Sequence, residues 1–225
     1  MLENILSIIY SLYFNLKYLS LKQALRFPIK INYHTKIRRL KKGNIIVNSE
    51  IISFGMIRMG ISKGSFNLAK NKSTIYIEDT CRLVFNGVCS IDGGFSIAIN
   101  KNGEINIGKN VHFNANANAI ISSSSLIKIC DNVGTGWDCT FMDWDGHDII
   151  NLETNKVINN PRHIIIDKNC WIGSKVTIMK GTVLCNNTII PYGSIITKKC
   201  DEPYCVFGGS PNHILRTNIA RKDKL

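Results

Sequence analysis

The sequence is short of several features that would assign it to a simple class of protein. With five prolines and 17 glycines in 225 residues, it is neither collagen-like nor of low complexity. Its eight cysteines include no Cys-x-x-Cys pair, and no histidine follows them at the spacing of a zinc finger. We therefore expect no metal site. The uncharged run from Asn4 to Leu16 is too short to span a bilayer. The first residues lack the basic region of a signal peptide, which together with unpatterned cysteines favours a reduced, cytoplasmic compartment.

Acidic residues are also scarce, 16 against 28 Lys and Arg, which gives a formal charge of +12. Such an excess suggests nucleic acid, an anionic membrane or a phosphate-bearing ligand as partner. The excess lies at the two ends of the chain. Residues 1–44 hold nine basic residues and one acidic residue (+8), residues 45–195 hold 13 and 12 (+1), and residues 196–225 hold six and three (+3). Because the long middle is nearly neutral, we expect no nucleic-acid partner.

The N-terminal segment has a helical pattern over Leu2 to Phe27, which Pro28 ends. The apolar positions that carry the pattern are Leu2, Ile5, Ile9, Leu12, Leu16 and Leu19. Six basic residues follow between Lys30 and Lys42. Two interpretations of residues 1–42 stay open: peripheral contact with an anionic membrane, or packing against the main domain or a sister subunit.

From Gly43 onward the sequence repeats every six residues. Bulky aliphatic residues stand at Ile166, Ile172, Ile178, Leu184, Ile190 and Ile196, and mostly small residues at Cys170, Val176, Thr182, Thr188 and Ser194. The same spacing occurs upstream in shifted registers, at Phe85, Ile91 and Ile97, at Ile107, Phe113 and Ala119, and at Ile129, Thr135, Phe141 and His147. A turn every six residues indicates a parallel β-helix whose repeats stack their bulky residues. An Ile-rich sandwich of short strands is the alternative, and it explains six in-register positions less well.

Four segments resemble the hexapeptide-repeat acyltransferases. Residues 166–174 (IDKNCWIGS), 191–198 (PYGSIITK) and 208–216 (GGSPNHILR) are similar to the segment after the loop, the last coil and the C-terminal exit of those enzymes. Residues 142–149 (MDWDGHDI) resemble the Asp-x-Asp-x-His segment of sugar and polysaccharide O-acetyltransferases. The resemblance covers residues 45–217. It implies an all-β solenoid, a left-handed parallel β-helix with an N-terminal α-helical segment.

The same resemblance implies how the chain is divided and assembled. Residues 1–43 form an N-terminal helix and basic arm, residues 44–200 the β-helix with loop 148–163 extruded, and residues 201–225 a tail that contacts CoA. The family is typically a homotrimer with acetyl-CoA in the groove between adjacent β-helices. Each active site then draws residues from two subunits.

The chemistry expected of such a site is acetyl transfer from a thioester to a sugar hydroxyl. His147 is the candidate general base, because a neutral imidazole can take the proton of the attacking hydroxyl. Asp145 and Asp143 are candidates to orient the imidazole, to stabilise the imidazolium or to hold sugar hydroxyls, with a solvated acidic loop as the alternative. Asn116 resembles an acceptor-binding Asn, although a turn residue is equally compatible with its position.

The remaining candidates would bind acetyl-CoA. By resemblance the N–H of Ser174 stabilises the oxyanion and Gly173 lets the pantetheine arm approach the backbone. The other candidate cofactor-binding residues are Trp171, Tyr192, Thr197, Lys198, Pro211 and Arg216. We therefore expect an acetyl-CoA-dependent O-acetyltransferase acting on a bacterial surface polysaccharide, such as capsule or lipopolysaccharide, or its precursor. A small-molecule acetyltransferase for an antibiotic or a free sugar and a non-catalytic β-helix binding module are the alternatives.

Overall fold

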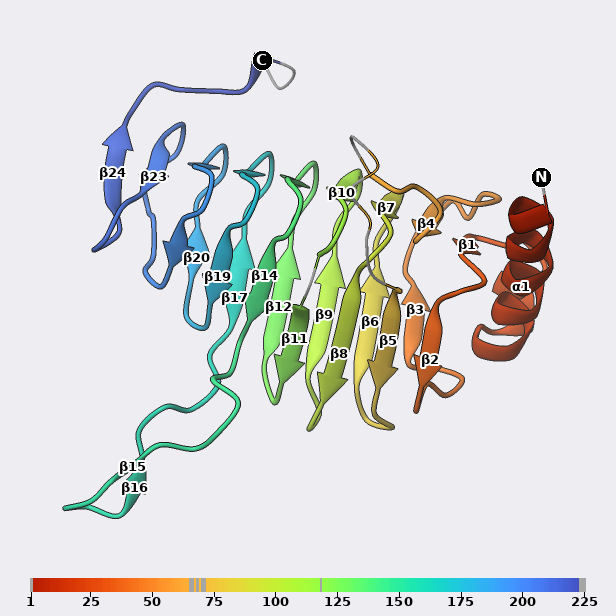
Figure 1. Ribbon diagram of the computed structural model, residues 1–225, viewed down its shortest axis with the longest axis horizontal. Helices are drawn as coiled ribbons and strands as arrows, with labels where there is room; N and C mark the ends of the chain where they lie inside the picture. Colours follow the sequence, from red (N-terminus) through yellow and green to blue (C-terminus); the bar gives the residue numbers. More distant parts are fainter. Residues whose placement is uncertain (1, 65–66, 68, 70–71, 118, 223–225) are drawn as a thin grey trace.

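The strands of the protein form three parallel sheets that run side by side along an elongated stack (Figure 1). The structure is a computed structural model that describes residues 2–64, 67, 69, 72–117 and 119–222. At the start of the stack, each of the first three strands pairs in parallel with the strand that comes three places later in the chain. A pairing between every third strand arises when the chain coils around three flat sides and adds one strand to each side per turn. The predicted coil of parallel strands is therefore present.

The three sheets are named A, B and C in the order in which the chain first enters them. Sheet A contains β1 (Ile29–Ile31), β4 (Ile57–Met59), β7 (Cys89–Ile91), β10 (Val111–Phe113), β13 (Gly134–Thr135), β18 (Trp171–Ile172), β21 (Ile189–Ile190), β23 (Val206–Gly208) and the antiparallel β24 (His213–Arg216). Sheet B contains β2 (Lys36–Arg38), β5 (Thr74–Ile77), β8 (Ser96–Asn100), β11 (Ala119–Ser123), β14 (Thr140–Met142), β19 (Thr177–Met179) and β22 (Ile195–Ile196). Sheet C contains β3 (Ile45–Val47), β6 (Arg82–Phe85), β9 (Glu104–Ile107), β12 (Leu126–Ile129), β17 (Ile164–Ile166) and β20 (Val183–Leu184).

The core consists of the residues that repeat every six positions. All six bulky residues from Ile166 to Ile196 are fully buried, and so are Cys170, Val176, Thr182 and Thr188 of the small series. Upstream, Phe113 and Phe141 meet edge to face with ring centroids 5.9 Å apart. Each such aliphatic or aromatic side chain contributes about 1.5–3 kcal/mol by leaving water. The periodicity therefore identified the interior of the coil correctly.

The helical segment differs from its prediction in extent and in the direction it faces. The continuous helix expected to Phe27 is divided into α1 (Leu2–Tyr18) and α2 (Leu21–Ala24). Ser20 lies between them in an extended conformation, and its side chain accepts a hydrogen bond from the N–H of Gln23. A serine that caps a new helix in this way ends the preceding one. Along α1 the apolar stripe faces outward, away from the coil.

The coil also begins earlier and ends later than its predicted bounds at residues 44 and 200. Its first strand starts at Ile29, so much of the basic segment from Lys30 to Lys42 belongs to the first turn of the coil. At the other end β23 adds a parallel strand to sheet A. The predicted loop 148–163 leaves the stack and carries a small hairpin of β15 (Ile150–Asn151) and β16 (Lys156–Val157) (Figure 1). None of the helices in the described ranges is both long and apolar enough to cross a membrane.

Candidate active site

His147 lies on the corner where the chain leaves sheet B for the hairpin loop. His147 follows the end of β14 by five residues. Although it belongs to the same six-residue series as the buried Phe141, its side chain is exposed to solvent. Among the described residues, none is hydrogen-bonded to the imidazole ring, whereas the backbone C=O of His147 accepts a bond from Asn159 Nδ2 at 2.7 Å. The backbone is thus held in place while the ring nitrogens remain open to a ligand.

A network of polar side chains fixes this corner. The Lys180 ammonium lies 2.5 Å from Asp145 Oδ2, and Asn159 Nδ2 donates to the same oxygen at 3.0 Å. Lys180 also donates to the C=O of Asn159 at 2.6 Å, and the N–H of Ile149 donates to Asn159 Oδ1 at 2.7 Å. The hydrogen bond from Lys180 holds the pKa of Asp145 below its usual range. Asp145 therefore supports the loop that carries His147 through its bonds to Lys180 and Asn159.

Asp143 is placed differently from Asp145, because its side chain is completely buried. Its Oδ1 accepts a hydrogen bond from the N–H of Ser123 at 2.8 Å, and its C=O accepts one from the N–H of Arg162 at 3.1 Å. These bonds tie the end of β11 and the return of the hairpin loop to the strand that precedes His147. In this chain Asp143 is a brace of the corner rather than a surface ligand for sugar hydroxyls.

A second corner, between sheets A and B, carries Gly173 and Ser174. The Ser174 N–H makes no hydrogen bond within the part of the chain that the structure describes, while its C=O accepts from the N–H of Gly193 at 2.9 Å. Gly136 lies beside it, and a Cβ on Gly136 would come within 2.5 Å of the Ser174 nitrogen. Glycine at position 136 thus lets this turn pack closely against the backbone of Ser174, which is itself buried.

Two predicted cofactor residues near this corner are aromatic. The Trp171 ring is half-buried on sheet A, and the guanidinium of Arg221 lies 5.0 Å from its centroid, so the C-terminal segment crosses its face. Tyr192 is exposed, with the Lys175 ammonium 5.9 Å from its ring centroid. A Cβ on Gly173 would lie 2.8 Å from the C=O of Ile190, so packing of successive coils already requires glycine there.

The predicted nucleotide end is organised by Asn212. Its Oδ1 accepts from the N–H of Thr197 at 2.8 Å, and its Nδ2 donates to the C=O of Ile195 at 2.7 Å. This buried amide fastens the exit segment to the last coil, next to Pro211. Lys198 and Arg216 are both exposed, as residues that bind phosphates need to be.

Asn116 lies on the same corner as Ser174, two coils earlier. Its φ is +57°, and Asp138 and Lys175 have φ of +59° and +57° at the corresponding turns of the following coils. Asn adopts this left-handed conformation more readily than most residues. The turn interpretation therefore accounts for Asn116 without a ligand.

Within one chain, the corner that carries His147 and the corner that carries Ser174 do not meet. Ser174 precedes β19, His147 follows β14, and these strands pair in parallel with Thr140 opposite Thr177. The two residues thus lie at opposite ends of sheet B, separated by a strand and its flanks, roughly 10 Å or more at about 3.3 Å per residue. Within a single chain, the predicted base His147 and the predicted oxyanion donor Ser174 therefore do not meet.

A third cluster was not anticipated from the sequence. His112 Nδ1 lies 2.6 Å from Ser90 Oγ, and His112 Nε2 lies 3.5 Å from Asp92 Oδ2, beside a cavity of about 450 Å³ that Arg58 also lines. Burial raises the pKa of Asp92, and His112 partly offsets the effect. Ser90 and His112 stand 22 positions apart and meet only because β7 pairs with β10. No set of three His, Cys, Asp or Glu side chains among the described residues could hold a metal ion.

Comparison with known proteins gives partial matches. No protein-family model matches the sequence. The chain is 36% identical over 102 residues to a polysialic acid O-acetyltransferase of Escherichia coli O1:K1 / APEC, covering 41% of this chain and 33% of that protein. It is 34% identical over 122 residues to the galactoside O-acetyltransferase of Escherichia coli (strain K12), covering 53% of this chain and 57% of that protein. The matches thus span a third to just over half of the relatives' lengths.

The fold is similar to that of the polySia-specific acetyltransferase NeuO, with a TM-score of 0.54 and 22% identity over 88% of this chain and 91% of that one. At this identity the likeness concerns the fold. The sequence motifs, the partial matches to two O-acetyltransferases and the stack of parallel strands agree with one another. By sequence and by fold, the chain resembles the hexapeptide-repeat acyltransferases, as its motifs predicted.

Proposed function

We propose that the protein is an acetyl-CoA-dependent O-acetyltransferase that acetylates a saccharide hydroxyl, with His147 as general base. The observation that carries the proposal is the corner after β14. There an exposed imidazole stands in the Asp-x-Asp-x-His segment on a backbone fixed by Asn159. A base that must reach a proton on a bulky acceptor needs this combination of a rigid support and free ring nitrogens.

The reaction is a direct attack on the thioester. The acceptor oxygen bonds to the acetyl carbonyl carbon as His147 takes the hydroxyl proton. The carbonyl oxygen becomes an oxyanion that the N–H of Ser174 receives. Collapse of the tetrahedral intermediate breaks the carbon–sulfur bond, and the imidazolium returns its proton to the CoA thiolate. All eight cysteine thiols of the chain are free, and this mechanism needs none of them.

The complete site is proposed to form between two subunits of a homotrimer whose coils are left-handed, as the family resemblance implies. The separation of His147 and Ser174 across sheet B supports this arrangement. His147 of one chain would face Ser174, Trp171 and the cofactor groove of its neighbour. Lys198 and Arg216 are exposed at the end of the coil where the CoA phosphates would lie.

The proposed acceptor is a bacterial surface polysaccharide, such as capsule or lipopolysaccharide, or its precursor. One relative matched in sequence is named for polysialic acid and another for galactosides, so a glycosyl acceptor is common to both. We also place the reaction in the cytoplasm. The proposal rests on the sequence, whose eight cysteines include no Cys-x-x-Cys pair and show no disulfide-framework pattern.

The test is to measure CoA release from acetyl-CoA with nucleotide sugars, oligosaccharides and isolated polysaccharides as acceptors. Replacing His147 by Ala should lower turnover by about two to four orders of magnitude, the usual contribution of a general base, and leave the fold intact. His34, which is also exposed but lies near the N-terminal end of the stack, provides the control as His34→Ala. A near wild-type rate for His147→Ala would refute the mechanism. Absence of acetyl transfer to every saccharide would refute the acceptor class.

A further inference from the structure

Most of the apolar side chains of helix α1 face solvent, while its buried face is partly polar. A surface helix normally buries its apolar face. The side chains that face the coil are Ser7, Ser11 and Asn15, which are spaced four residues apart, together with the aromatic Phe14 and Tyr18, and all five are buried. The apolar side chains of the opposite face point away from the coil and are between 36% and 70% exposed: Leu2, Ile5, Leu6, Ile9, Leu12, Tyr13 and Leu16. We call these seven residues the outer stripe.

This arrangement has a structural cause at the open edge of sheet A. Asn15 Oδ1 accepts from the N–H of Ile29 at 3.1 Å, and Asn15 Nδ2 donates to the C=O of Ile29 at 2.7 Å. Ser11 Oγ accepts from the N–H of Ile31 at 2.9 Å. These side chains satisfy the backbone of β1 as a neighbouring strand would, and so close an edge that is otherwise prone to pair with other chains. Because these polar side chains are needed there, most of the apolar ones are left outward.

The outer stripe is larger than the edge-capping role explains. None of the seven residues of the outer stripe is charged, and they extend along a 17-residue helix that is about 25 Å long at 1.5 Å per residue. Contiguous apolar surface of this kind marks a place where a protein meets a partner or a membrane. Further apolar side chains are exposed in and after α2 and in the loop between β3 and β4: Leu21, Leu25, Ile51 and Phe54.

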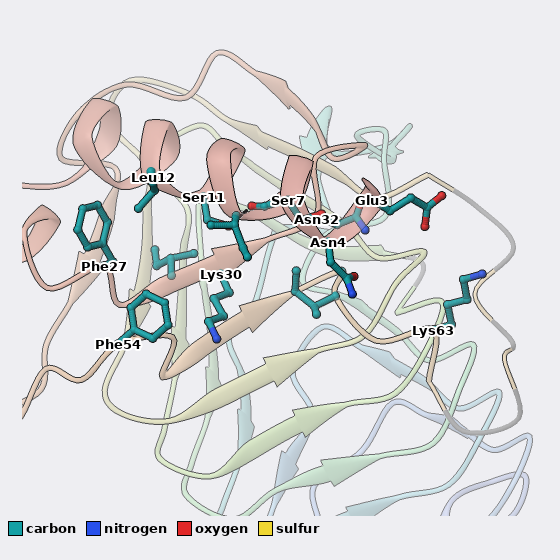
Figure 2. Close-up of a pocket in the computed structure, with 14 residues that line it drawn as sticks. Glu3, Asn4, Ser7, Ser11, Leu12, Phe27, Lys30, Asn32, Phe54 and Lys63 are labelled. Carbon is teal, nitrogen blue, oxygen red and sulfur yellow. Dashed lines mark hydrogen bonds between the residues drawn. The ribbon is translucent and has the colours of Figure 1, made fainter. Parts of the chain in front are cut away.

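A cavity of about 380 Å³ lies beside the stripe, between α1 and the first coils. In Figure 2, Phe27 and Phe54 gather at one end of it, and Glu3 and Lys63 stand at the other. Leu12 lines this cavity and is also part of the outer stripe. The Lys30 ammonium lies 4.5 Å from the Phe54 ring centroid, so a cation stands directly against the apolar surface.

Charge identifies the occupant of this surface. Residues 1–44 carry nine Lys or Arg and one Glu, a net +8, and Lys17, Lys22 and Arg26 are exposed next to the stripe. A second copy docked end to end would place one +8 segment against another, which like-charge repulsion opposes. An anionic lipid surface instead takes up the apolar side chains and neutralises the cations.

We infer that the outer stripe of α1 docks on an anionic membrane surface, with the adjacent Lys17, Lys22 and Arg26 against the lipid headgroups. Helix α1 lies across one end of the stack (Figure 1), so the long axis of the coil would stand away from the membrane. In the proposed trimer, three such helices would share one end and bind the surface together.

The test uses the full chain with vesicles of phosphatidylcholine containing about one third phosphatidylglycerol, and with pure phosphatidylcholine vesicles. Co-sedimentation should show binding to the anionic vesicles that weakens with added salt, and little binding to the zwitterionic ones. The variant Ile9→Ser/Leu16→Ser should weaken binding by about tenfold or more, because two side chains no longer enter the apolar layer. Its matched control is Val88→Ser/Leu152→Ser, which removes two exposed apolar side chains elsewhere and should bind as the wild type.

Charge reversal gives an independent reading. Lys22→Glu/Arg26→Glu should reduce binding to anionic vesicles by about tenfold, whereas Lys128→Glu/Lys168→Glu, with the same change in net charge, should not. Absence of binding to anionic vesicles, or equal binding by the stripe variant and its control, would overturn the inference. So would a concentration-dependent doubling of the oligomer that Ile9→Ser/Leu16→Ser abolishes, since a second copy would then cover the stripe.

Discussion

At the corner between sheets A and B, Gly173 lies so close to the backbone of the next coil that no larger residue fits there without a shift. Gly173 was expected to make room for the pantetheine arm. A Cβ there would meet the C=O of Ile190 and the N–H of Tyr192 at 2.8 Å each. Glycine is therefore needed for the stacking of neighbouring coils, whether or not a cofactor is bound.

Replacing Gly173 by Ala should destabilise the protein by about 1–3 kcal/mol, the usual cost of overpacking, measured as a lower urea midpoint. Gly193→Asn is the control, because Gly193 has φ of +70° with nothing within 4 Å of its Cβ position, and Asn tolerates that conformation. An unchanged midpoint together with weaker acetyl-CoA binding would show that the close approach serves the cofactor alone.

Single residues also mark the limit of prediction from sequence. The buried positions from Ile166 to Ile196 followed from spacing, because each repeat imposes the same environment on the same position. Lys180 and Asn159 had no such signal. Their bonds to Asp145 span 35 and 14 positions and depend on how the hairpin loop returns to the stack.

At the scale of elements, the corner after β14 is a unit built by three segments. Asp145 and His147 come from the loop entry, Asn159 from its return, and Lys180 from the turn after β19. Lys180 lowers the pKa of Asp145. Their ion pair therefore stabilises the fold at pH values above the ordinary carboxyl pKa of about 4. That contribution is lost as pH falls through the lowered pKa.

Lys180→Met should raise the pKa of Asp145 towards its usual range and loosen the support of His147. We expect kcat to fall by about tenfold with the KM for acetyl-CoA unchanged, because a misplaced base affects the chemical step. NMR titration of the Asp145 carboxyl and steady-state kinetics measure the two effects, and Lys180→Arg should restore both. Lys168→Met, at an exposed position on another coil, is the control. If Lys180→Met shifts the pKa of Asp145 but leaves kcat unchanged, the ion pair does not position His147.

The elements themselves were predicted unevenly. The helical spacing from Leu2 onward indicated α1, but it did not reveal which face would be buried. Ordinary amphipathic reasoning assigns the apolar face to the interior. The opposite arrangement follows from the unpaired edge of β1, which the bonds of Ser11 and Asn15 satisfy. A tertiary demand for hydrogen bonds thus places Ser11 and Asn15 beside Phe14 and Tyr18 on the buried face and leaves most of the apolar residues outside.

At the scale of the whole molecule, the period of six predicted a coil but carried no information on its hand or on its assembly. Both were inferred from resemblance, since neither the stacking of bulky residues nor the spacing of turns depends on a second chain. The structure adds an independent reason for assembly. His147 and Ser174, the proposed base and oxyanion donor, stand at opposite ends of sheet B, so under the proposed mechanism a lone chain would hold two incomplete half-sites.

Mixed oligomers test whether these half-sites combine. His147→Ala chains lack the base, and Lys198→Glu/Arg216→Glu chains are expected to lose acetyl-CoA, so each pure oligomer should be inactive. When the two chains are co-expressed in equal amounts, about a quarter of the interfaces in a cyclic trimer pair an intact base with an intact cofactor side. Acetyl transfer should recover to about that fraction of the wild-type rate. Mixtures no more active than the separate variants would mean that one chain supplies both halves, and the site between subunits would have to be abandoned.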